Sequence, residues 1–362
     1  MGIRNRRQVY LENDRLRLVL LPGGGHIGAI ELKENGVNPL WDPPWDTMDP
    51  SAYDPKAHPQ FGGGVDARLL AGIAGHNLCF DIFGVPSEAE AAAGLGVHGE
   101  ASSVDWDVEA GDGWLRAQAD LPLAGMRFER HMELVPGSSR VAIAETATNL
   151  TGIDRAVGWT QHATLGPPFL EKGRTLFEMS ATRSKVIETE FAPGADRFVT
   201  AAEFDWPDVP LAAGGIGDLR QTVDIPASGG YTAHLMNPAE PQAFFAAYHP
   251  GQETLFGYVW KRSDFPWLGI WEENASRAHA PWNGRTLTRG MEFGASPFPE
   301  TRREAVERGK LFGEGTLGWV PARSAVSVEY SLFLCRARPE DLSGFGSGLG
   351  LDDIKRYADG RA

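Results

Sequence analysis

The stretch MRFERHMELV, residues 126–135, alternates in polarity, with Met126, Phe128 and Met132 among the side chains on its apolar face. Successive side chains of a β-strand point to opposite faces, so this period of two predicts a half-buried antiparallel strand. The stretch SVEYSLFLC, residues 327–335, alternates in the same way. Together the two stretches favour a fold built from antiparallel sheets.

Strand-like runs recur along the rest of the chain. They lie at residues 15–21, 141–150, 244–248, 254–260 and 268–271. The segments between them are rich in turn formers, since the chain holds 44 Gly and 25 Pro. Short strands separated by frequent turns are typical of a sandwich or a barrel.

Helical signals are few and short. SEAEAAAG, from Ser87, and TRREAVERGK, from Thr301, each place a Glu three positions after a hydroxyl residue, which is the spacing of a capping box. LDDIKRYADG, from residue 351, is a third candidate. None is long enough to cover a parallel sheet, and strands do not alternate with helices, which argues against a doubly wound fold. The sequence predicts an all-β fold, a large antiparallel β-sandwich with a few short helices.

The domain organisation follows from length and the absence of linkers. A chain of 362 residues could form two ordinary domains, but all-β folds often run longer as one unit. No linker-like segment divides the strand-bearing part. We expect a single domain over residues 1–362, with its core at about 10–337 and a C-terminal tail at 338–362.

Net charge and hydropathy limit the kinds of ligand and partner that the chain is expected to bind. The formal net charge of −14 argues against a nucleic-acid partner, which needs basic patches, and favours a neutral or weakly charged ligand. No stretch approaches the roughly 18 apolar residues of a membrane span, and the basic N-terminus lacks the apolar run of a secretory signal. We expect a cytoplasmic protein without a membrane partner, either a monomer or a homodimer. Cys79 and Cys335 are expected to be buried and unpaired.

Familiar cofactor and metal motifs can be set aside. Gly94, Gly96 and Gly99 satisfy GxGxxG, but an Ala-rich helical piece precedes them and a turn follows, whereas a dinucleotide site needs a strand before and a helix after. HExxH, CxxC, a P-loop and GxSxG are all absent, and no two His lie three to five residues apart. The sequence therefore predicts neither a metal nor an organic cofactor.

Three segments combine ionisable side chains with Gly- or Pro-rich surroundings. They are GLGVHGEAS with His98, WTQHATLGPPFLE with His162, and RGMEFGASPFPE with Glu292. Taken alone, a His is more often a hydrogen-bonded structural residue than a catalyst, and a Glu at a strand end is usually solvated. Their types nevertheless suit general acid–base chemistry, because imidazole and carboxylate exchange protons near neutral pH.

In this order the three segments resemble the aldose 1-epimerase (galactose mutarotase-like) superfamily. Its members carry a His in a Leu-His-Gly type run, a second His after an Asn and before a turn, and a Glu late in the chain shortly before a Pro. Residues 21–41, LPGGGHIGAIELKENGVNPLW, resemble the family's opening hairpin. The resemblance spans residues 10–337 and implies the galactose mutarotase-like sandwich.

The resemblance also implies a reaction, the interconversion of sugar anomers by ring opening and closure. It makes Glu292 the base that takes the proton of the anomeric hydroxyl and His162 the acid that protonates the ring oxygen. His98 would hydrogen-bond the ring oxygen or a neighbouring hydroxyl. Val97 and Gln161 stand where the family has Leu and Asn. The catalytic trio therefore matches the family better than the substrate-binding residues do, and the resemblance does not identify the sugar.

Substrate-binding candidates come from the aromatic residues and from position. A sugar presents apolar C–H faces, which pack on aromatic rings, and we expect the Trp residues that flank Glu292 to form this platform. His26, Asp264 and Arg285 are better explained as structural or surface residues. The substrate-binding candidates are Trp267, Trp271, Trp282, Arg68, His76 and Gln161.

Two other functions remain open at this point. A glycoside-cleaving or lyase-type enzyme on the same scaffold would need a second carboxylate opposite the acid. The sequence offers Glu100, Glu171, Glu272 and Glu273 for that role. A non-catalytic carbohydrate-binding protein would keep the Trp platform without needing the trio. In each case the expected ligand is a monosaccharide or a small glycoside.

Overall fold

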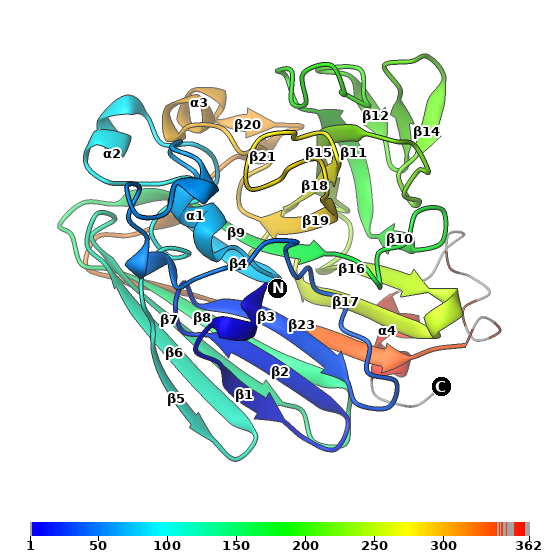
Figure 1. Cartoon of the computed structure of the whole chain (residues 1–362), viewed down its shortest axis with the longest axis horizontal. Coiled ribbons are helices and arrows are strands. Elements are labelled where there is room, and N and C mark those ends of the chain that lie inside the picture. Colours follow the sequence, from blue (N-terminus) through cyan, green and yellow to red (C-terminus); the bar gives the residue numbers. More distant parts are fainter. Residues whose placement is uncertain (1, 339, 341, 343–344, 346–350, 359–362) are drawn as a thin grey trace.

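The computed structural model describes residues 2–338, 340, 342, 345 and 351–358. The expected tail at 338–362 therefore lies partly outside the described residues. Two large antiparallel sheets make up most of the described chain, as the sequence predicted (Figure 1). They pack face to face as a β-sandwich, with the short helices lying on the outside.

The larger sheet carries the strands that matter for the candidate site. Its order is β1 (Val9–Glu12), β2 (Leu16–Leu21), β3 (His26–Leu32), β4 (His76–Asp81), β9 (Arg155–Leu165), β19 (Leu287–Gly294), β18 (Trp267–Asn274), β15 (Ser228–Met236), β11 (Ala181–Val186) and β12 (Glu203–Asp205), with β22 (Gly318–Val320) paired to β9. Central strands thus come from distant parts of the sequence.

The smaller sheet covers one face of the larger one. Its order is β10 (Leu176–Met179), β16 (Gln242–His249), β17 (Thr254–Lys261), β23 (Ala325–Arg336), β8 (Arg140–Asn149), β7 (Met126–Leu134), β6 (Trp114–Leu121) and β5 (Asp107–Gly111). Two hairpins stand apart, β13 (Asp208–Pro210) with β14 (Ile216–Asp218), and β20 (Lys310–Leu311) with β21 (Glu314–Gly315).

The helices are short and lie outside the sheets. They are α1 (Ala67–Gly72), α2 (Glu88–Ala92), α3 (Arg302–Arg308) and α4 (Leu351–Ala358), with 3₁₀ turns at Ile3–Asn5, Pro50–Ala52, Pro59–Phe61 and Pro250–Gln252. Both predicted capping boxes are present: Ser87 with Glu90 begins α2, and Thr301 with Glu304 begins α3. Within the described residues, no helix has the length and apolar character needed to cross a bilayer.

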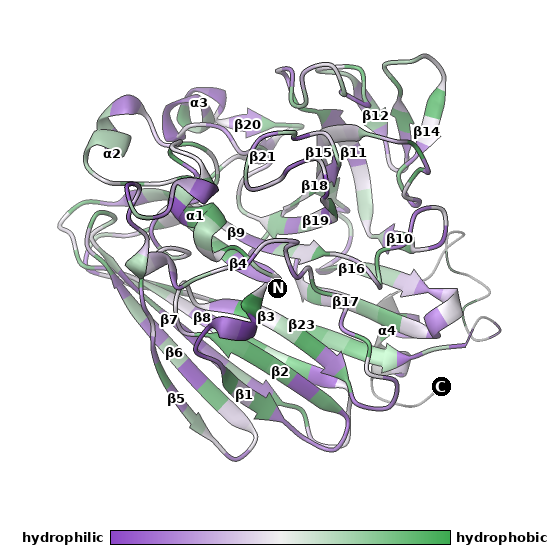
Figure 2. Cartoon of the chain, in the orientation of Figure 1, coloured by the Kyte–Doolittle hydropathy of each residue, from purple (hydrophilic) through white to green (hydrophobic). Residues whose placement is uncertain are grey.

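Alternation explains which strand faces are buried. β7 and β23 form where the two period-two stretches predicted them, and β7 buries every second residue. Figure 2 shows the same alternation of hydrophilic and hydrophobic residues along β6. β15 and β18 are buried on both faces instead, because loops cover the outer face of the larger sheet at that point. Cys79 and Cys335 are buried and unpaired, as predicted.

The two largest apolar clusters lie on the two faces of the larger sheet. One fills the space between the sheets, with Phe128, Phe293 and Leu332 among its members. The other lies on the opposite face of the larger sheet, where Trp41, Trp282 and residues of α1 pack against β15 and β18. The second cluster surrounds the candidate site described below.

Three fully buried histidines make the fold sensitive to acid. Burial lowers the pKa of His26 to about 3, and burial also lowers the pKa values of His76 and His234 well below 6.5. The unfolded chain therefore binds more protons than the folded one below pH 6.5, and stability falls as the pH drops from 6.5 towards 3. Each such histidine removes up to about 1.4 kcal/mol of stability per pH unit in that window.

We expect the free energy of unfolding in urea to be level between pH 8 and 7 and to fall steeply between pH 6.5 and 5. In this window ordinary carboxylates stay ionised, so the histidines dominate. The exposed His279 supplies the control, because His279→Asn should leave the slope unchanged. A level stability down to pH 5 would show that these histidines accept protons in the folded state.

Candidate active site

His162 and Glu292 lie directly opposite each other on neighbouring strands. β9 and β19 pair with His162 in register with Glu292, so both side chains project from the same face of the sheet. His162 Nε2 lies 2.9 Å from Glu292 Oε1, and the two side chains are 4% and 2% exposed. Two residues 130 positions apart in the sequence are thus in hydrogen-bonding contact because of strand register alone.

A hydroxyl fixes the other side of the His162 ring. Nδ1 of His162 lies 2.8 Å from Oγ1 of Thr164, which is two residues along β9 and on the same face. With Glu292 on Nε2 and Thr164 on Nδ1, both ring nitrogens have a partner and the ring plane is held. The imidazole can therefore exchange a proton at Nε2 without reorienting.

Gly290 provides the space that Glu292 needs. A Cβ atom at residue 290 would lie 2.5 Å from Glu292 Oε1, too close for the present position of the carboxylate. Gly269, opposite Glu292 on β18, provides space for the Tyr231 hydroxyl, which donates to the Pro297 carbonyl. Gly290 on β19 and Gly269 on the neighbouring β18 thus leave the space that Glu292 and Tyr231 occupy.

The Gly290→Ala variant should reduce any activity that depends on Glu292 far more than it reduces stability. The contacted atom is the end of a flexible side chain, so the chain can fold with the carboxylate displaced. A displacement of about 1 Å at a catalytic group can cost on the order of 10²-fold in rate. Gly152→Ala is the matched control, because nothing lies within 4 Å of a Cβ built there. Unchanged activity in Gly290→Ala, measured beside its melting temperature, would contradict this role.

His98 joins the pair from a loop that follows α2. Its ring centroid lies 5.2 Å from that of His162, and its backbone takes a positive φ of 66°. Such a backbone conformation is uncommon for a residue with a Cβ and is found at sites where the surroundings dictate it. The ring also stacks on Phe83, with centroids 6.0 Å apart.

The surroundings of His98 keep its imidazole neutral. Burial, reinforced by the nearby His162, lowers the pKa of His98 to about 3. Nδ1 donates to the Phe83 carbonyl, 2.5 Å away, so Nε2 carries the lone pair in the neutral ring. His98 can accept a hydrogen bond from a hydroxyl at Nε2, but it cannot serve as an acid near neutral pH.

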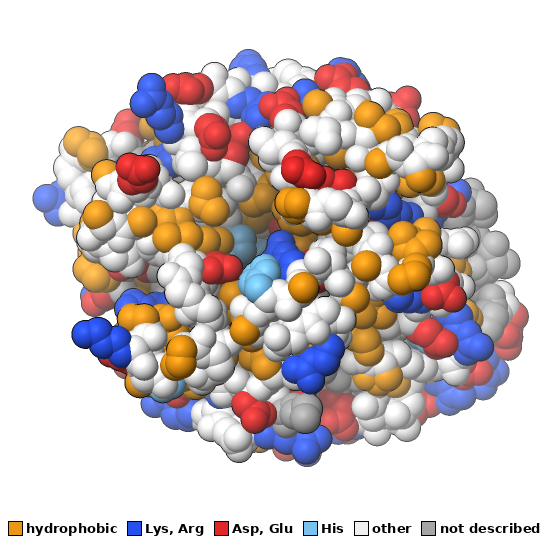
Figure 3. Space-filling model, turned by 45° about the horizontal axis from the view of Figure 1, so that its top comes forward, with side chains coloured by type: hydrophobic (Ala, Val, Ile, Leu, Met, Phe, Trp, Pro, Cys, Tyr) orange, Lys and Arg blue, Asp and Glu red, His pale blue; other side chains and the backbone are white. Residues whose placement is uncertain are grey.

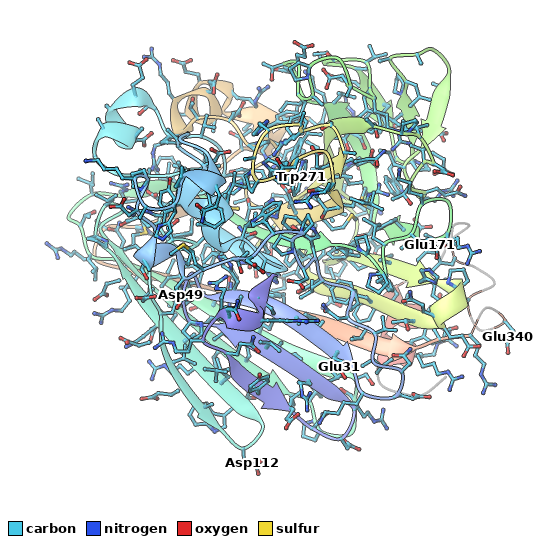
Figure 4. The ribbon with its side chains drawn as sticks, viewed as in Figure 1. Glu31, Asp49, Asp112, Glu171, Trp271 and Glu340 are labelled. Atoms are coloured by element: carbon cyan, nitrogen blue, oxygen red, sulfur yellow. The ribbon has the colours of Figure 1, made fainter. Side chains whose placement is uncertain are left out.

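The three residues line a cavity of about 430 Å³ on the outer face of the larger sheet. Its walls are mostly apolar, formed by α1, the loop around Val97 and the rings of Trp271 and Trp282. Figure 3 shows a hollow on this side of the molecule, with histidine, basic and hydrophobic side chains around it. Trp271, labelled in Figure 4, belongs to β18, and its side chain is buried at the cavity. A cavity of this size with few polar groups suits a small organic ligand.

Five of the nine predicted site residues lie together in this cavity. They are His98, His162, Glu292, Trp271 and Trp282. The ring of Trp271 stands at 62° to that of His162 with centroids 5.5 Å apart, and it contacts Trp282 edge-on at 6.0 Å. Two of the three predicted tryptophans thus lie in the same cavity as the histidines.

The structure does not bring the other four predicted substrate-binding residues into this cavity. Gln161 and His76 point to the opposite face, between the sheets, where Gln161 Oε1 lies 2.9 Å from His76 Nε2. Adjacent strand residues alternate, so Gln161 cannot share the face of His162. Trp267 is buried with its Nε1 donating to the Gly315 carbonyl, and Arg68 is exposed on α1 outside the cavity lining.

Sequence reasoning missed Arg277. It lies in the loop that joins β18 to β19, lines the cavity, and places its guanidinium 4.8 Å from the ring centroid of Trp282. Its Nε pairs with Glu273 Oε2 at 3.3 Å. Its residue type gave no signal, although its loop joins the strands that carry Trp271 and Glu292. Tyr231 and Phe191 line the cavity as well.

The four carboxylates considered for a second catalytic acid make other contacts. Glu100 accepts from the Ala124 backbone N–H, Glu273 binds Arg277, and Glu272 binds Arg197. Glu171 pairs with His249 and lies at the edge of the molecule, far from Trp271 (Figure 4). Asp66, at the N-terminus of α1, is the acidic residue that lines the cavity besides Glu292.

Two further observations concern the rest of the described chain. A cavity of about 400 Å³ lies over the outer face of the smaller sheet, lined by β7, β8, β17 and β23, and it contains none of the predicted catalytic residues. No group of three or more His, Cys, Asp or Glu among the described residues is arranged to hold a metal ion.

Comparison with known proteins places the fold. No protein-family model and no curated protein matches the sequence. A solved structure named as a candidate aldose 1-epimerase from Klebsiella pneumoniae does match, with a TM-score of 0.64 over 96% of this chain and 82% of that one. The chain has the galactose mutarotase-like fold.

Other solved structures agree. A candidate aldose 1-epimerase from Escherichia coli K12 has a TM-score of 0.59 and covers 91% of this chain and 99% of its own. A galactose mutarotase-like protein from Lactobacillus casei has a TM-score of 0.56 and covers 91% and 100%. Sequence identities are 14% for the Klebsiella and Lactobacillus proteins and 12% for the Escherichia protein. At such low identity the structural similarity establishes the fold of this chain and not its activity.

Proposed function

We propose that this protein is a cofactor-free sugar isomerase that interconverts the anomers of an aldose. The observation that carries the proposal is the direct contact between His162 and Glu292 on the wall of an aromatic-lined cavity, with a neutral His98 beside them. The galactose mutarotase-like fold and the names of its structural neighbours are consistent with it.

The reaction balances with the groups at hand. Glu292 takes the proton of the anomeric hydroxyl while His162 Nε2 gives a proton to the ring oxygen, and the bond between the anomeric carbon and the ring oxygen breaks. The open aldehyde turns about one carbon–carbon bond. Ring closure on the other face then reverses both proton transfers, so no electrons are gained or lost. Each positioned acid or base contributes about 10²–10⁴-fold in rate.

The 2.9 Å contact between the two groups keeps the base and the acid side by side at one centre. After ring opening, Glu292 holds a proton and His162 has lost one. Ring closure takes a proton back to His162 and returns one from Glu292, so both groups regain their starting states without solvent. His98, which accepts at Nε2, would orient a sugar hydroxyl and would not supply a proton.

The cavity walls suit a monosaccharide or a small glycoside. Trp271 and Trp282 offer flat apolar surfaces for the C–H faces of a ring, and Arg277 and Asp66 add polar groups to the lining. The direct test is polarimetry with freshly dissolved single anomers of a panel of aldoses. We expect the protein to accelerate mutarotation of at least one of them, and a panel without acceleration would overturn the proposal.

Asp66→Asn distinguishes the isomerase from a glycoside hydrolase. A hydrolase on this site would use Asp66 as its second carboxylate, because the other four candidates are engaged elsewhere. The isomerase needs only Glu292 as base, so Asp66→Asn should retain most of the exchange rate. Loss of activity in Asp66→Asn as complete as in Glu292→Gln, together with release of an alcohol from aryl glycosides, would favour the hydrolase.

A further inference from the structure

Two buried arginines share one carboxylate on the opposite face of the larger sheet from the active-site cavity. Arg289 on β19 and Glu272 on β18 are cross-strand partners, with Arg289 Nη2 lying 3.8 Å from Glu272 Oε1. Arg197, from the loop between β11 and β12, donates Nη1 to Glu272 Oε2 at 2.5 Å. The side chains of Arg289 and Arg197 are 0% and 5% exposed.

Several donors of these arginines have no partner within the described part of the chain. They are Nε and Nη1 of Arg289 and Nη2 of Arg197. The remaining Nη2 of Arg289 donates to the Leu219 carbonyl, and its guanidinium lies over the ring of Phe177 at 4.1 Å. Buried N–H groups of a charged side chain nearly always have a hydrogen-bond partner, so unpaired ones point to an occupant.

The charges of the cluster do not balance. Two guanidinium groups face one carboxylate, that of Glu272. Glu273 pairs with Arg277, and Asp218 pairs with Arg220 while its charge also acts on Arg289. A buried charge that is incompletely paired is costly, and an anion at the free donors would complete the pairing of Arg289 and Arg197.

A small cavity adjoins both arginines. Its volume is about 20 Å³, room for a single particle the size of a water molecule. The Thr222 hydroxyl donates to the Glu171 carbonyl, and Asn274 Nδ2 donates to the Ile225 carbonyl, whereas Glu272 Oε1 also lines the cavity without a hydrogen-bond partner. The spare donors at this cavity are those of Arg197 and Arg289.

We propose that Arg197 and Arg289 hold a halide ion, with chloride as the natural occupant, in this cavity. A water molecule would accept the free N–H groups but leave the positive charge unmatched. Sulfate or phosphate would exceed the space, and their second charge would repel Glu272. This site is independent of the isomerase function proposed above and lies behind the strands that carry Trp271 and Glu292, where it would hold β18 against β19.

Halide exchange tests the proposal on the intact protein. Thermal unfolding is followed at constant ionic strength while sodium chloride replaces sodium methanesulfonate, whose anion is too large for the cavity. Binding of a ligand to the folded state alone raises the melting temperature in a saturable way, by about 2 °C when chloride reaches ten times its Kd. Arg289→Met and Arg197→Gln should abolish this dependence. The exposed Arg183→Gln, on the same sheet, should keep it.

Crystals of the wild type grown in sodium bromide provide a measurement that does not depend on the variants folding. We expect an anomalous bromine peak within about 3.5 Å of the free nitrogens of Arg197 and Arg289. A water molecule without an anomalous signal would overturn the proposal. A bromine peak combined with a melting temperature that chloride does not change below 0.5 M would mean an adventitious ion only, and would overturn it too.

Discussion

The Glu292→Gln variant is expected to lose about 10²–10⁴-fold in the rate of anomer exchange while it keeps its fold. The amide is nearly isosteric with the carboxylate and can still hydrogen-bond His162 Nε2, but it cannot take the proton of the anomeric hydroxyl. Saturation-transfer NMR between the two anomeric protons measures the exchange rate directly. Glu300→Gln is the control, because Glu300 pairs with Arg308 and is not part of the proposed acid–base pair.

A variant of His162 gives a second test of the proposed acid–base pair. His162→Asn should cost a comparable factor, and the double variant should cost little more than the worse of the two, because groups that act as a unit are not additive. An exchange rate in Glu292→Gln within threefold of wild type would remove Glu292 from the mechanism.

The largest effect on stability is expected from Glu145→Ala. Glu145 lies between the sheets, 0% exposed, and accepts from Arg130 Nε, Trp159 Nε1, Gln161 Nε2 and the Tyr330 hydroxyl. Truncation leaves the fully buried Arg130 without its counterion, and breaking such a pair typically costs about 3–5 kcal/mol. The free energy of unfolding in urea measures the loss.

Two further variants distinguish the cost of leaving Arg130 unpaired from the cost of truncating a Glu side chain. Glu129→Ala removes an ion pair with the exposed Arg116 on neighbouring strands of the same sheet, and it should cost at most about 1 kcal/mol. Arg130→Met combined with Glu145→Leu should recover part of the loss, because an apolar pair leaves no charge unmatched. If Glu145→Ala were as mild as Glu129→Ala, the pair would not hold the sheets together.

The strands could be predicted because alternation is a local property. β7 and β23 began and ended within two residues of their period-two stretches, and the capping boxes at Ser87 and Thr301 gave the starts of α2 and α3. The order of strands could not be predicted in this way. β9 lies between β4 and β19, and that neighbourhood depends on packing between distant segments.

The candidate site could likewise be predicted only in part. Family order singled out His98, His162 and Glu292, but the contact of His162 with Glu292 follows from the register of β9 with β19, which no single segment encodes. Gln161 was predicted as a site residue because it stands where the family has Asn, although strand alternation sends it to the other face. Trp267 shares a face with Trp271 but lies four residues along β18, beyond the cavity.

The central claim is that Glu292, His162 and His98 act together on one anomeric centre. A crystal structure of Glu292→Gln soaked with the aldose that the wild type exchanges fastest tests it most directly. We expect the anomeric hydroxyl within about 3.2 Å of the residue 292 side chain, the ring oxygen within the same distance of His162 Nε2, and a sugar hydroxyl donating to His98 Nε2. A sugar bound in the cavity with its anomeric carbon turned away from His162 and residue 292 would contradict the account.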